Sequence, residues 1–285
     1  MSIFLEFALL YYLFLFQAQK YDISLTCESF HYLCQRKTKP YPVKMHNFKQ
    51  LLKDEFKGWK PFDVIWLVTV SVVITVMSIL FKYDSATDRF YWIHIVAAAC
   101  GIINVVLGGK GKLSNYLFGF IHCCLMLYIT LISRLYADFG VTVYNFVMQF
   151  VGFFTWAKNM NHETHEVMKI HMTNRSRLIS LAVIVVGTIG FGLLMKHFTN
   201  DLAPFADSAK AVMQVVAMIL MVRMFSEQWW LWIAINCVSI FMYVKAGNFP
   251  ITMMYLVYLV NSIIMCVRWE KEAIMNDKVL SRIRE

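Results

Sequence analysis

Long apolar runs separated by short polar segments are the feature that most restricts the fold of this chain. Most of them reach the roughly 20 residues that an α-helix needs to cross the hydrocarbon of a bilayer. Their apolar residues are continuous, whereas the strands of a membrane barrel alternate apolar and polar residues. We therefore expect an all-α integral membrane protein with about eight transmembrane helices. The predicted spans are 62–82, 89–107, 113–133, 138–157, 177–196, 208–222, 229–246 and 249–269.

The charge content also favours a membrane protein. Only 16% of the residues are charged and 59% are hydrophobic, whereas a soluble domain carries about 25% charged residues. The net charge of +9 would suit nucleic acid only if the basic residues shared one face. They fall instead between the apolar runs, which indicates membrane topology and no nucleic-acid partner.

Basic residues are concentrated in alternate loops. Positively charged loops stay on the cytoplasmic side of a membrane, so both ends of the membrane core should be cytoplasmic and the number of spans even. We expect a multi-pass protein of the inner (plasma) membrane, in contact with lipid. The segments expected on the cytoplasmic side are 44–61, 108–112, 158–177, 223 and 268–285.

The first 44 residues do not fit this pattern. The opening MSIFLEFALLYYLFLFQ is apolar over too few residues for a span, and it lacks the basic start and small-residue cleavage site of a signal peptide. Two prolines break the chain before Met45. We hypothesise that residues 1–44 are a dispensable extension and that the functional chain starts at Met45. An amphipathic helix would lead from there into the first span.

Two segments of the apolar region resemble each other. FGVTVYNF at 139 and FPITMMYL at 249 share Phe, a turn residue, an aliphatic residue and Thr. Two three-helix units, 89–157 and 208–269, would flank the span 177–196. An odd number of connecting helices keeps the units in the same orientation, which is a parallel repeat, a design of transporters that hold substrate between two halves. A chance likeness between apolar segments is the alternative.

Catalytic and metal-binding motifs are missing from the sequence. GGKGKLS at 108–114 departs from the phosphate-loop pattern G-x-x-x-x-G-K-[ST]. His162 and His165 are three residues apart, whereas the zinc motif H-E-x-x-H places its histidines four apart. The cysteines form no C-x-x-C pair, and most lie within apolar runs as small hydrophobic residues. We expect no enzymatic activity, no cofactor and no bound metal.

Neutral polar and aromatic side chains recur at helical spacing within the spans. An amide without hydrogen-bond partners is costly in hydrocarbon, so these side chains should face the interior of the bundle. Helix–helix contact is the alternative role for each of them. Trp229 and Trp230 begin their span and suit the interfacial belt of tryptophans instead. The candidate binding residues are Asn145, Gln149, Trp232, Asn236, Ser239, Tyr243, Tyr255, Tyr258 and Asn261.

Aromatic faces combined with amides suit a planar ligand that carries hydroxyl groups. Rings stack on a base or a pyridine, amides hydrogen-bond a sugar or a carboxamide, and a cationic ring gains cation–π attraction. The acids Asp63, Asp138, Asp207 and Glu227 lie at span edges, whereas an ion-coupled carrier commonly places a carboxylate within the membrane. The sequence therefore favours passive transport of such a ligand.

Two stretches of the spans carry a recognisable pattern: EQWWLWIAINCVSIFMYVKAGNFPITMMYLVYLVNSIIMCVRW at 227–269 and NYLFGFIHCCLMLYITLISRLYADFGVTVYNFVMQFVGFFTW at 115–156. Both resemble the PnuC family of nicotinamide riboside transporters. The resemblance implies a SWEET-like 3+1+3 arrangement: two three-helix bundles, a linking helix, and an extra N-terminal helix. It also implies facilitated diffusion of nicotinamide riboside, trapping by a cytoplasmic ribosylnicotinamide kinase that feeds NAD synthesis, and a homotrimer.

The family motifs coincide with seven of the candidate residues. Trp232, Asn236, Tyr243, Tyr255 and Tyr258 match the C-terminal motif, and Asn145 and Gln149 match the N-terminal one. Asn236 stands where an acid is often expected, so the choice of cargo within the family stays open. Three alternatives remain: the same fold carrying another vitamin such as thiamine, a membrane enzyme that uses the loop from His162 to His171, and a scaffold that transports nothing.

These observations divide the chain into six predicted segments. They are an extension at 1–44, an amphipathic helix with the extra span at 45–88, a first three-helix bundle at 89–157, a cytoplasmic loop with the linking span at 158–207, a second three-helix bundle at 208–269, and a cytoplasmic tail at 270–285.

Overall fold

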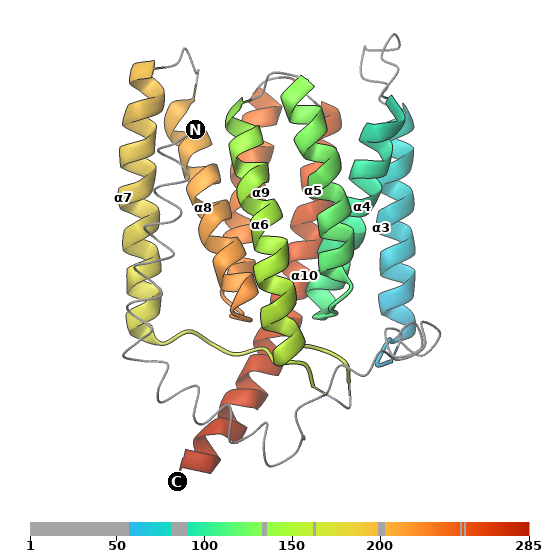
Figure 1. Cartoon of the computed structure of the whole chain (residues 1–285), viewed down its shortest axis with the longest axis vertical. Coiled ribbons are helices and arrows are strands. Elements are labelled where there is room, and N and C mark those ends of the chain that lie inside the picture. The colour runs from blue at the N-terminus through green and yellow to red at the C-terminus, as the bar shows by residue number, and fades with distance from the viewer. Residues whose placement is uncertain are drawn as a thin grey trace.

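The computed structural model describes residues 57–80, 91–132, 136–161, 164–198, 203–245, 247 and 249–284. Eight α-helices lie in these residues, and all but the last begin and end within a few residues of a predicted span (Figure 1). The predicted helical fold is therefore confirmed. The helices are α3 (Pro61–Leu80), α4 (Tyr91–Lys110), α5 (Asn115–Ile132), α6 (Tyr136–Lys158), α7 (Asn174–Phe198), α8 (Pro204–Val222), α9 (Gln228–Lys245) and α10 (Phe249–Arg284).

Five of these helices are long and apolar enough to cross a membrane, namely α4, α5, α7, α8 and α10. The apolar part of α3 is shorter and covers Pro61–Val76. Amides lower the hydropathy of the other two: α6 carries Asn145 and Gln149, and α9 carries Gln228 and Asn236. Two helices that carry buried amides are thus among those that composition alone does not identify as spans.

The last helix is longer than expected. We predicted that the final span ends near residue 269 and that residues 270–285 form a tail, but α10 continues without a break to Arg284. This correction has a local cause, because residues 270–284 contain no glycine or proline and are rich in good helix formers. The predicted N-terminal extension and most of the amphipathic helix after it lie outside the described residues. Residues 57–60 form a turn around Gly58.

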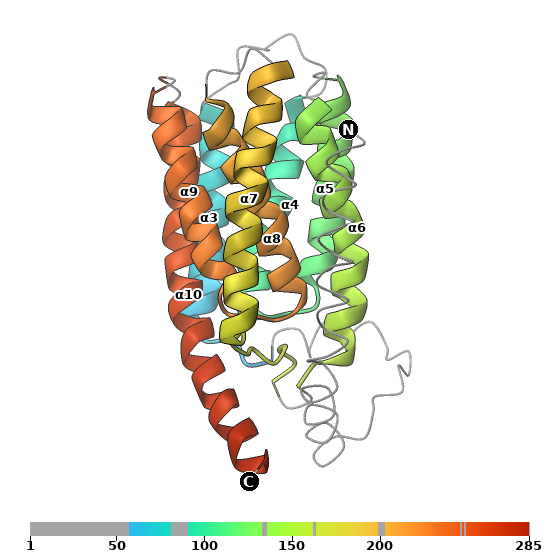
Figure 2. The ribbon, with the colours of Figure 1, turned by 90° about the vertical axis from the view of Figure 1, so that its left-hand side faces the viewer.

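The helices form two groups of three that pack side by side. Helices α4, α5 and α6 pack in sequence, as do α8, α9 and α10, and α7 packs along α8 (Figures 1 and 2). The groups meet where α6 contacts α8 and where α4 contacts α10, while α3 packs on α4 and α10. We call α4–α6 the first bundle and α8–α10 the second bundle.

Equivalent turns follow the first helix of each bundle. Gly111 after α4 and Met224 after α8 both adopt positive φ, +78° and +64°. The next residues repeat the pattern, since Lys112 N–H donates to Leu107 O and Phe225 N–H donates to Leu220 O, each at 3.0 Å. The number of residues from Gly111 to Met224 is close to the number that separates the two similar segments, which begin at 139 and 249. The two numbers differ by less than one turn of helix. The parallel repeat stays a prediction, and the matched turns support it.

A polypeptide segment crosses beneath both bundles between α6 and α7. We call residues 164–173 the strap; they form no helix, and isolated bridges join Val167 to Met160 and Ile170 to Phe225. The strap lies at the end of the molecule where α10 projects beyond the other helices (Figure 1). Two basic residues that we expected on the cytoplasmic side, Lys110 and Arg268, lie at this end of the molecule, where both contact Asp63.

Candidate substrate-binding site

A row of four aromatic rings links the two bundles near the strap. Tyr116 packs edge-on against Trp156 at 5.0 Å between centroids, Trp156 lies 6.2 Å from Trp269, and Trp269 lies 6.0 Å from Trp229. Tyr116 and Trp229 are as far apart along the sequence as Trp156 and Trp269. The turn residues Gly111 and Met224 are separated by the same number of residues. We call the four ring residues the aromatic row.

Trp229 belongs to this row and not to a membrane belt. Its side chain is 3% exposed, whereas Trp230 beside it is 59% exposed. The expectation that Trp229 is an interfacial belt residue is therefore wrong, while the exposure of Trp230 suits the lipid side. Trp232, one turn after Trp229, is half-buried and packs against the same core cluster. Because every position of α9 between Gln228 and Asn236 is apolar, hydropathy could not tell these tryptophans apart.

Buried polar atoms without partners surround the aromatic row. Asn115 and Gln228 are fully buried, and within the described part of the chain the side-chain oxygen and nitrogen of both amides lack hydrogen bonds. The Tyr116 hydroxyl and the Trp229 indole N–H also lack partners there. Each such atom costs about 1–3 kcal/mol if nothing satisfies it, so these groups are candidates to bind a ligand or water. Sequence reasoning missed Gln228 and Tyr116 because each lies where a polar loop gives way to a span.

Gln149 packs against small and polar groups of α4 and α5. A Cβ added to Gly119 would sit 2.3 Å from Gln149 Oε1 and 2.9 Å from Asn104 Oδ1. The glycine therefore lets the amide lie against α5. Gln149 is buried, its side-chain oxygen has no partner among the described residues, and Cys123 lies within hydrogen-bond reach of it. Asn145, one turn earlier on α6, is half-buried.

Asn236 and Ser262 occupy, in the second bundle, the places that Cys123 and Gln149 occupy in the first. Its side-chain nitrogen donates to the Ser262 hydroxyl at 3.1 Å, and Ser262 donates to the carbonyl of Tyr258 at 2.8 Å. Cys123 and Asn236 are separated along the sequence by the same number of residues as the paired members of the aromatic row, and so are Gln149 and Ser262. Ser239 is fully buried, and its hydroxyl has no partner within the described residues. Asn236 and Ser262 thus meet at the α9–α10 contact, whereas the Tyr258 side chain packs against the core cluster of α3 and α4.

Three predicted tyrosines form a second aromatic group along α9 and α10. Tyr243 stacks on Tyr255 at 5.5 Å with an interplanar angle of 14°, and Tyr255 meets Tyr258 edge-on at 6.1 Å. Lys210 lies 6.0 Å from the Tyr243 ring and pairs with Asp207 at 3.6 Å. This group approaches the end of the molecule opposite the strap, since Tyr243 is near the end of α9.

Asn261 points away from the other candidates. Its side-chain oxygen accepts the indole N–H of Trp66 on α3 at 2.9 Å. Its neighbour Ser262 faces α9 instead. Asn261 therefore fastens the extra helix α3 to α10, which is the helix-contact role that the sequence had left open.

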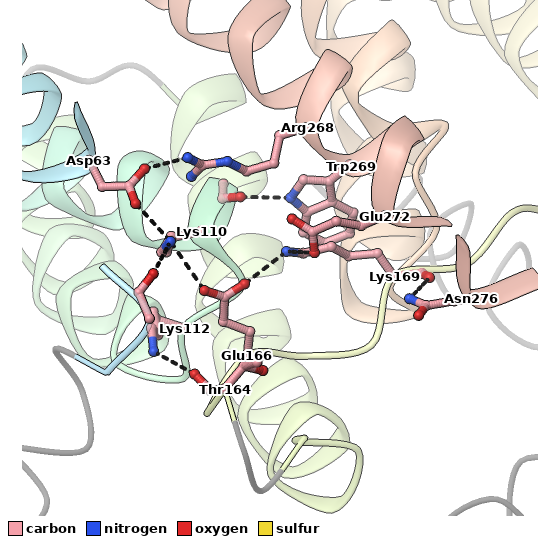
Figure 3. A network of polar contacts seen from close by, with 12 residues as sticks. Asp63, Lys110, Lys112, Thr164, Glu166, Lys169, Arg268, Trp269, Glu272 and Asn276 are labelled. Atoms are coloured by element: carbon pink, nitrogen blue, oxygen red, sulfur yellow. Dashed lines mark hydrogen bonds and ion pairs between the residues drawn. The ribbon is translucent and has the colours of Figure 1, made fainter. Parts of the chain in front are cut away.

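Paired ionic groups of the described residues lie at the ends of the helices. At the strap end, Asp63 contacts Lys110 at 2.8 Å and also Arg268, and Lys169 contacts Glu166 and Glu272 (Figure 3). Within the described ranges, no three His, Cys, Asp or Glu side chains are placed to hold a metal ion. The described groups between the two ends include amides, hydroxyls and aromatic rings, which can bind a ligand, and the imidazole of His122, whose Nδ1 lies 2.8 Å from the carbonyl oxygen of Ala97.

The sequence of this chain matches a family of membrane transporters. The model of the nicotinamide mononucleotide transporter family covers residues 91–271, which include both bundles, the strap and α7. The chain belongs to this family. The predicted PnuC resemblance is confirmed by relatives: nicotinamide riboside transporter PnuC of Neisseria mucosa is 34% identical over 230 residues, which cover 77% of this chain and 84% of the relative.

Two further comparisons agree. Nicotinamide riboside transporter PnuC of Haemophilus influenzae is 32% identical over 224 residues, covering 77% of this chain and 95% of the relative. A crystal structure of the vitamin B3 transporter PnuC is similar in fold, with a TM-score of 0.65 and 33% identity, and the match covers 80% of this chain and 98% of that chain. The chain is therefore a multi-pass membrane transporter by family.

Membership of a transporter family removes the enzyme alternative. His162, at one end of the loop considered for it, lies outside the described residues. The other end of that loop is engaged elsewhere, since the ring nitrogens of His171 lie 2.6 Å from Asp277 and 2.8 Å from Glu270. His171 thus serves contacts between the strap and α10.

Proposed function

We propose that this chain carries nicotinamide riboside across the inner (plasma) membrane by facilitated diffusion, with the substrate held between the two bundles. The curated relatives at 34% and 32% identity are both nicotinamide riboside transporters. Their similarity extends over most of this chain, and the matching family model includes the two stretches that carry the candidate residues. The assignment of the cargo rests on this similarity together with the chemistry of the interior.

One observation carries the proposal: the buried polar groups between the helix ends are neutral amides and hydroxyls next to aromatic rings. Nicotinamide riboside has a cationic pyridine ring, a carboxamide and ribose hydroxyls. Gln149 and Asn236 offer donors and acceptors for the carboxamide or the ribose. Trp232 and Tyr258 offer faces on which the ring can stack, with cation–π attraction for its charge.

The distribution of charge supports passive transport. The ion pairs of the described residues lie at the strap end, around Asp63 and Lys169, and at the opposite end, between Asp207 and Lys210. A carrier coupled to protons or sodium commonly binds the ion with a carboxylate inside the membrane. The described interior offers neutral groups in that place, so we propose a uniporter.

The surroundings of the transporter are part of the same proposal. We place the strap end in the cytoplasm because the basic segments gather there. A cytoplasmic ribosylnicotinamide kinase would trap the imported riboside and feed NAD synthesis, and the chain would work as a homotrimer. The kinase and the trimer come from the family resemblance alone.

Competition binding tests the choice of cargo. Purified protein is titrated with labelled nicotinamide riboside, and unlabelled nicotinamide riboside and thiamine are compared as competitors. We expect nicotinamide riboside to displace the label at much lower concentration than thiamine. Stronger displacement by thiamine would assign this chain to the thiamine alternative.

A further inference from the structure

The strap binds the backbone of both bundles at equivalent positions. Val167 N–H donates to the carbonyl of Gly111 at 2.9 Å, and Ile170 N–H donates to the carbonyl of Met224 at 3.1 Å. Gly111 and Met224 are the two residues with positive φ in the matched turns. Ser226 N–H returns a bond to the carbonyl of Ile170 at 2.9 Å. A short stretch of strap is thus hydrogen-bonded to the first bundle and to the second bundle.

A chain of charges follows the same path. Glu166 of the strap contacts Lys110 of the first bundle at 3.2 Å, and Lys169 of the strap contacts Glu166 at 3.2 Å. Lys169 then reaches Glu272 on α10 of the second bundle at 2.5 Å (Figure 3). The Lys169 side chain is fully buried. A buried ammonium needs close anionic partners, because its loss of hydration is otherwise costly.

The part of α10 beyond residue 269 also contacts the strap. Asn276 donates to the carbonyl of Lys169 at 2.8 Å. The two ring nitrogens of His171 lie against Asp277 and Glu270. Residues 270–277 of α10 therefore contact the strap through two helical faces, one carrying Glu270 and Asp277 and the other carrying Glu272 and Asn276.

The strap covers the aromatic row that links the bundles. Lys169 Nζ lies 5.6 Å from the centre of the Trp269 ring, and Trp269 donates its indole N–H to Gly109 of the first bundle at 2.7 Å. If the bundles separate at this end, the carbonyls of Gly111 and Met224 move apart. Only Met168 and Lys169 stand between Val167 and Ile170, so the strap cannot follow both carbonyls and must leave one of them.

We propose that the strap is a latch that holds this end of the transporter closed, with the ion pair between Lys169 and Glu272 as its clasp. This inference rests on the proposed function, because it assumes that the two bundles move against each other. Opening requires the clasp to release, so a variant without the clasp spends more time open at the strap end. The structure described above, with every strap contact formed, is closed at that end.

A buried native thiol reports the opening. Cys266 on α10 is buried in the same core cluster as Tyr116, Trp156 and Trp269. Detergent-purified full-length protein is treated with N-ethylmaleimide, and modification of Cys266 is followed by mass spectrometry of its peptide. We expect Lys169→Met and Glu272→Gln to raise the rate of modification about tenfold, since removing one partner of a buried ion pair costs more than a tenfold change requires.

Matched controls separate the latch from general loosening. Lys210→Met removes the ion pair at the opposite end and should leave the Cys266 rate at the wild-type value. Glu272 is partly exposed, so Glu272→Gln remains informative if Lys169→Met fails to fold. Wild-type rates in both clasp variants, or an equal rise in Lys210→Met, would overturn the latch. Loss of nicotinamide riboside flux in the wild type would overturn the proposed function and leave the alkylation result standing.

Discussion

Trp269 of the second bundle donates its indole N–H to the carbonyl oxygen of Gly109 in the first bundle, 2.7 Å away. Trp156 of the first bundle makes the reciprocal contact with the carbonyl of Met221 in the second bundle, at 3.1 Å. Both indoles are fully buried. Water cannot replace these bonds without a change of structure, so the reciprocal pair sets how the bundles meet.

Replacing Trp269 with phenylalanine should destabilise the protein. The carbonyl of Gly109 would lose its donor, and the smaller ring would leave a cavity, for a combined cost of about 2–4 kcal/mol. Thermal unfolding in detergent measures the effect. Trp230→Phe is the control because Trp230 is exposed and its side-chain hydrogen bond to Glu270 is open to solvent, so it should lower the melting temperature much less than Trp269→Phe. Equal melting temperatures for the two variants would contradict a structural role for the indole bond.

Gly152→Ala tests the packing of the aromatic row. A Cβ added to Gly152 would lie 2.2 Å from the Tyr116 ring, and Tyr116 is held against Trp156. We expect a loss of about 1–3 kcal/mol from overpacking. Gly190→Ala meets nothing within 4 Å, so it should be neutral or stabilise by about 0.5–1 kcal/mol through its better helix propensity. Equal stability of Gly152→Ala and Gly190→Ala would contradict the close approach of α5 and α6 at Gly152.

Substitution of the interior amides should separate binding from stability. Gln149→Ala and Asn236→Ala remove groups that we propose to contact the substrate, and each should weaken nicotinamide riboside binding by about tenfold or more. Asn261→Ala should lower the melting temperature, since it leaves the Trp66 indole without its acceptor, and should keep wild-type affinity. Titration calorimetry and thermal unfolding of all three variants give both quantities. A loss of affinity confined to Asn261→Ala would reverse this assignment.

The strap contact of His171 should make stability depend on pH. Burial lowers the pKa of His171, but the hydrogen bonds and charges of Glu270 and Asp277 outweigh it and raise the pKa above 6.5. Both ring nitrogens face carboxylates that only accept hydrogen bonds, so the imidazolium satisfies both. A pKa raised in the folded state gives stabilisation that is complete below the unfolded pKa and is lost as pH rises through the folded pKa.

The melting temperature of the wild type should therefore fall across that pH range. His171→Gln cannot titrate, and its melting temperature should change less with pH over the same interval. Parallel curves for the wild type and His171→Gln would show that the stabilising charge at this contact lies on another group.

Much of the helical arrangement could be predicted from the sequence, because a helix that crosses a membrane must be continuously apolar. Because the helices are apolar on all sides, the sequence did not indicate which face of each helix points into the bundle. With lipid on one side and core on the other, both faces of α9 and α10 are apolar, and no hydrophobic stripe separates Asn261 from Ser262. Only the packing of α3 showed that Asn261 meets Trp66 and lies outside the α9–α10 contact.

The strap and the end of α10 were beyond sequence reasoning for another reason. Charged residues in a loop usually face water, so Lys169 and Glu272 had no signal of burial or pairing. Their contact joins segments that are far apart in the sequence, and it forms only because the bundles bring α10 beneath the strap. The place of residues 270–284 after the last span predicted a cytoplasmic tail. Their composition favours a helix, and contacts with the strap stabilise it there.

The central claim is that nicotinamide riboside crosses the membrane through the interior between the bundles, down its own gradient. Uptake of labelled nicotinamide riboside into sealed vesicles that contain the purified protein tests it most directly. We expect saturable uptake that stops at equal concentrations inside and outside, at the same rate with and without proton or sodium gradients, and that is reduced by Gln149→Ala. Uptake no greater than in protein-free vesicles, or accumulation driven by an ion gradient, would contradict it.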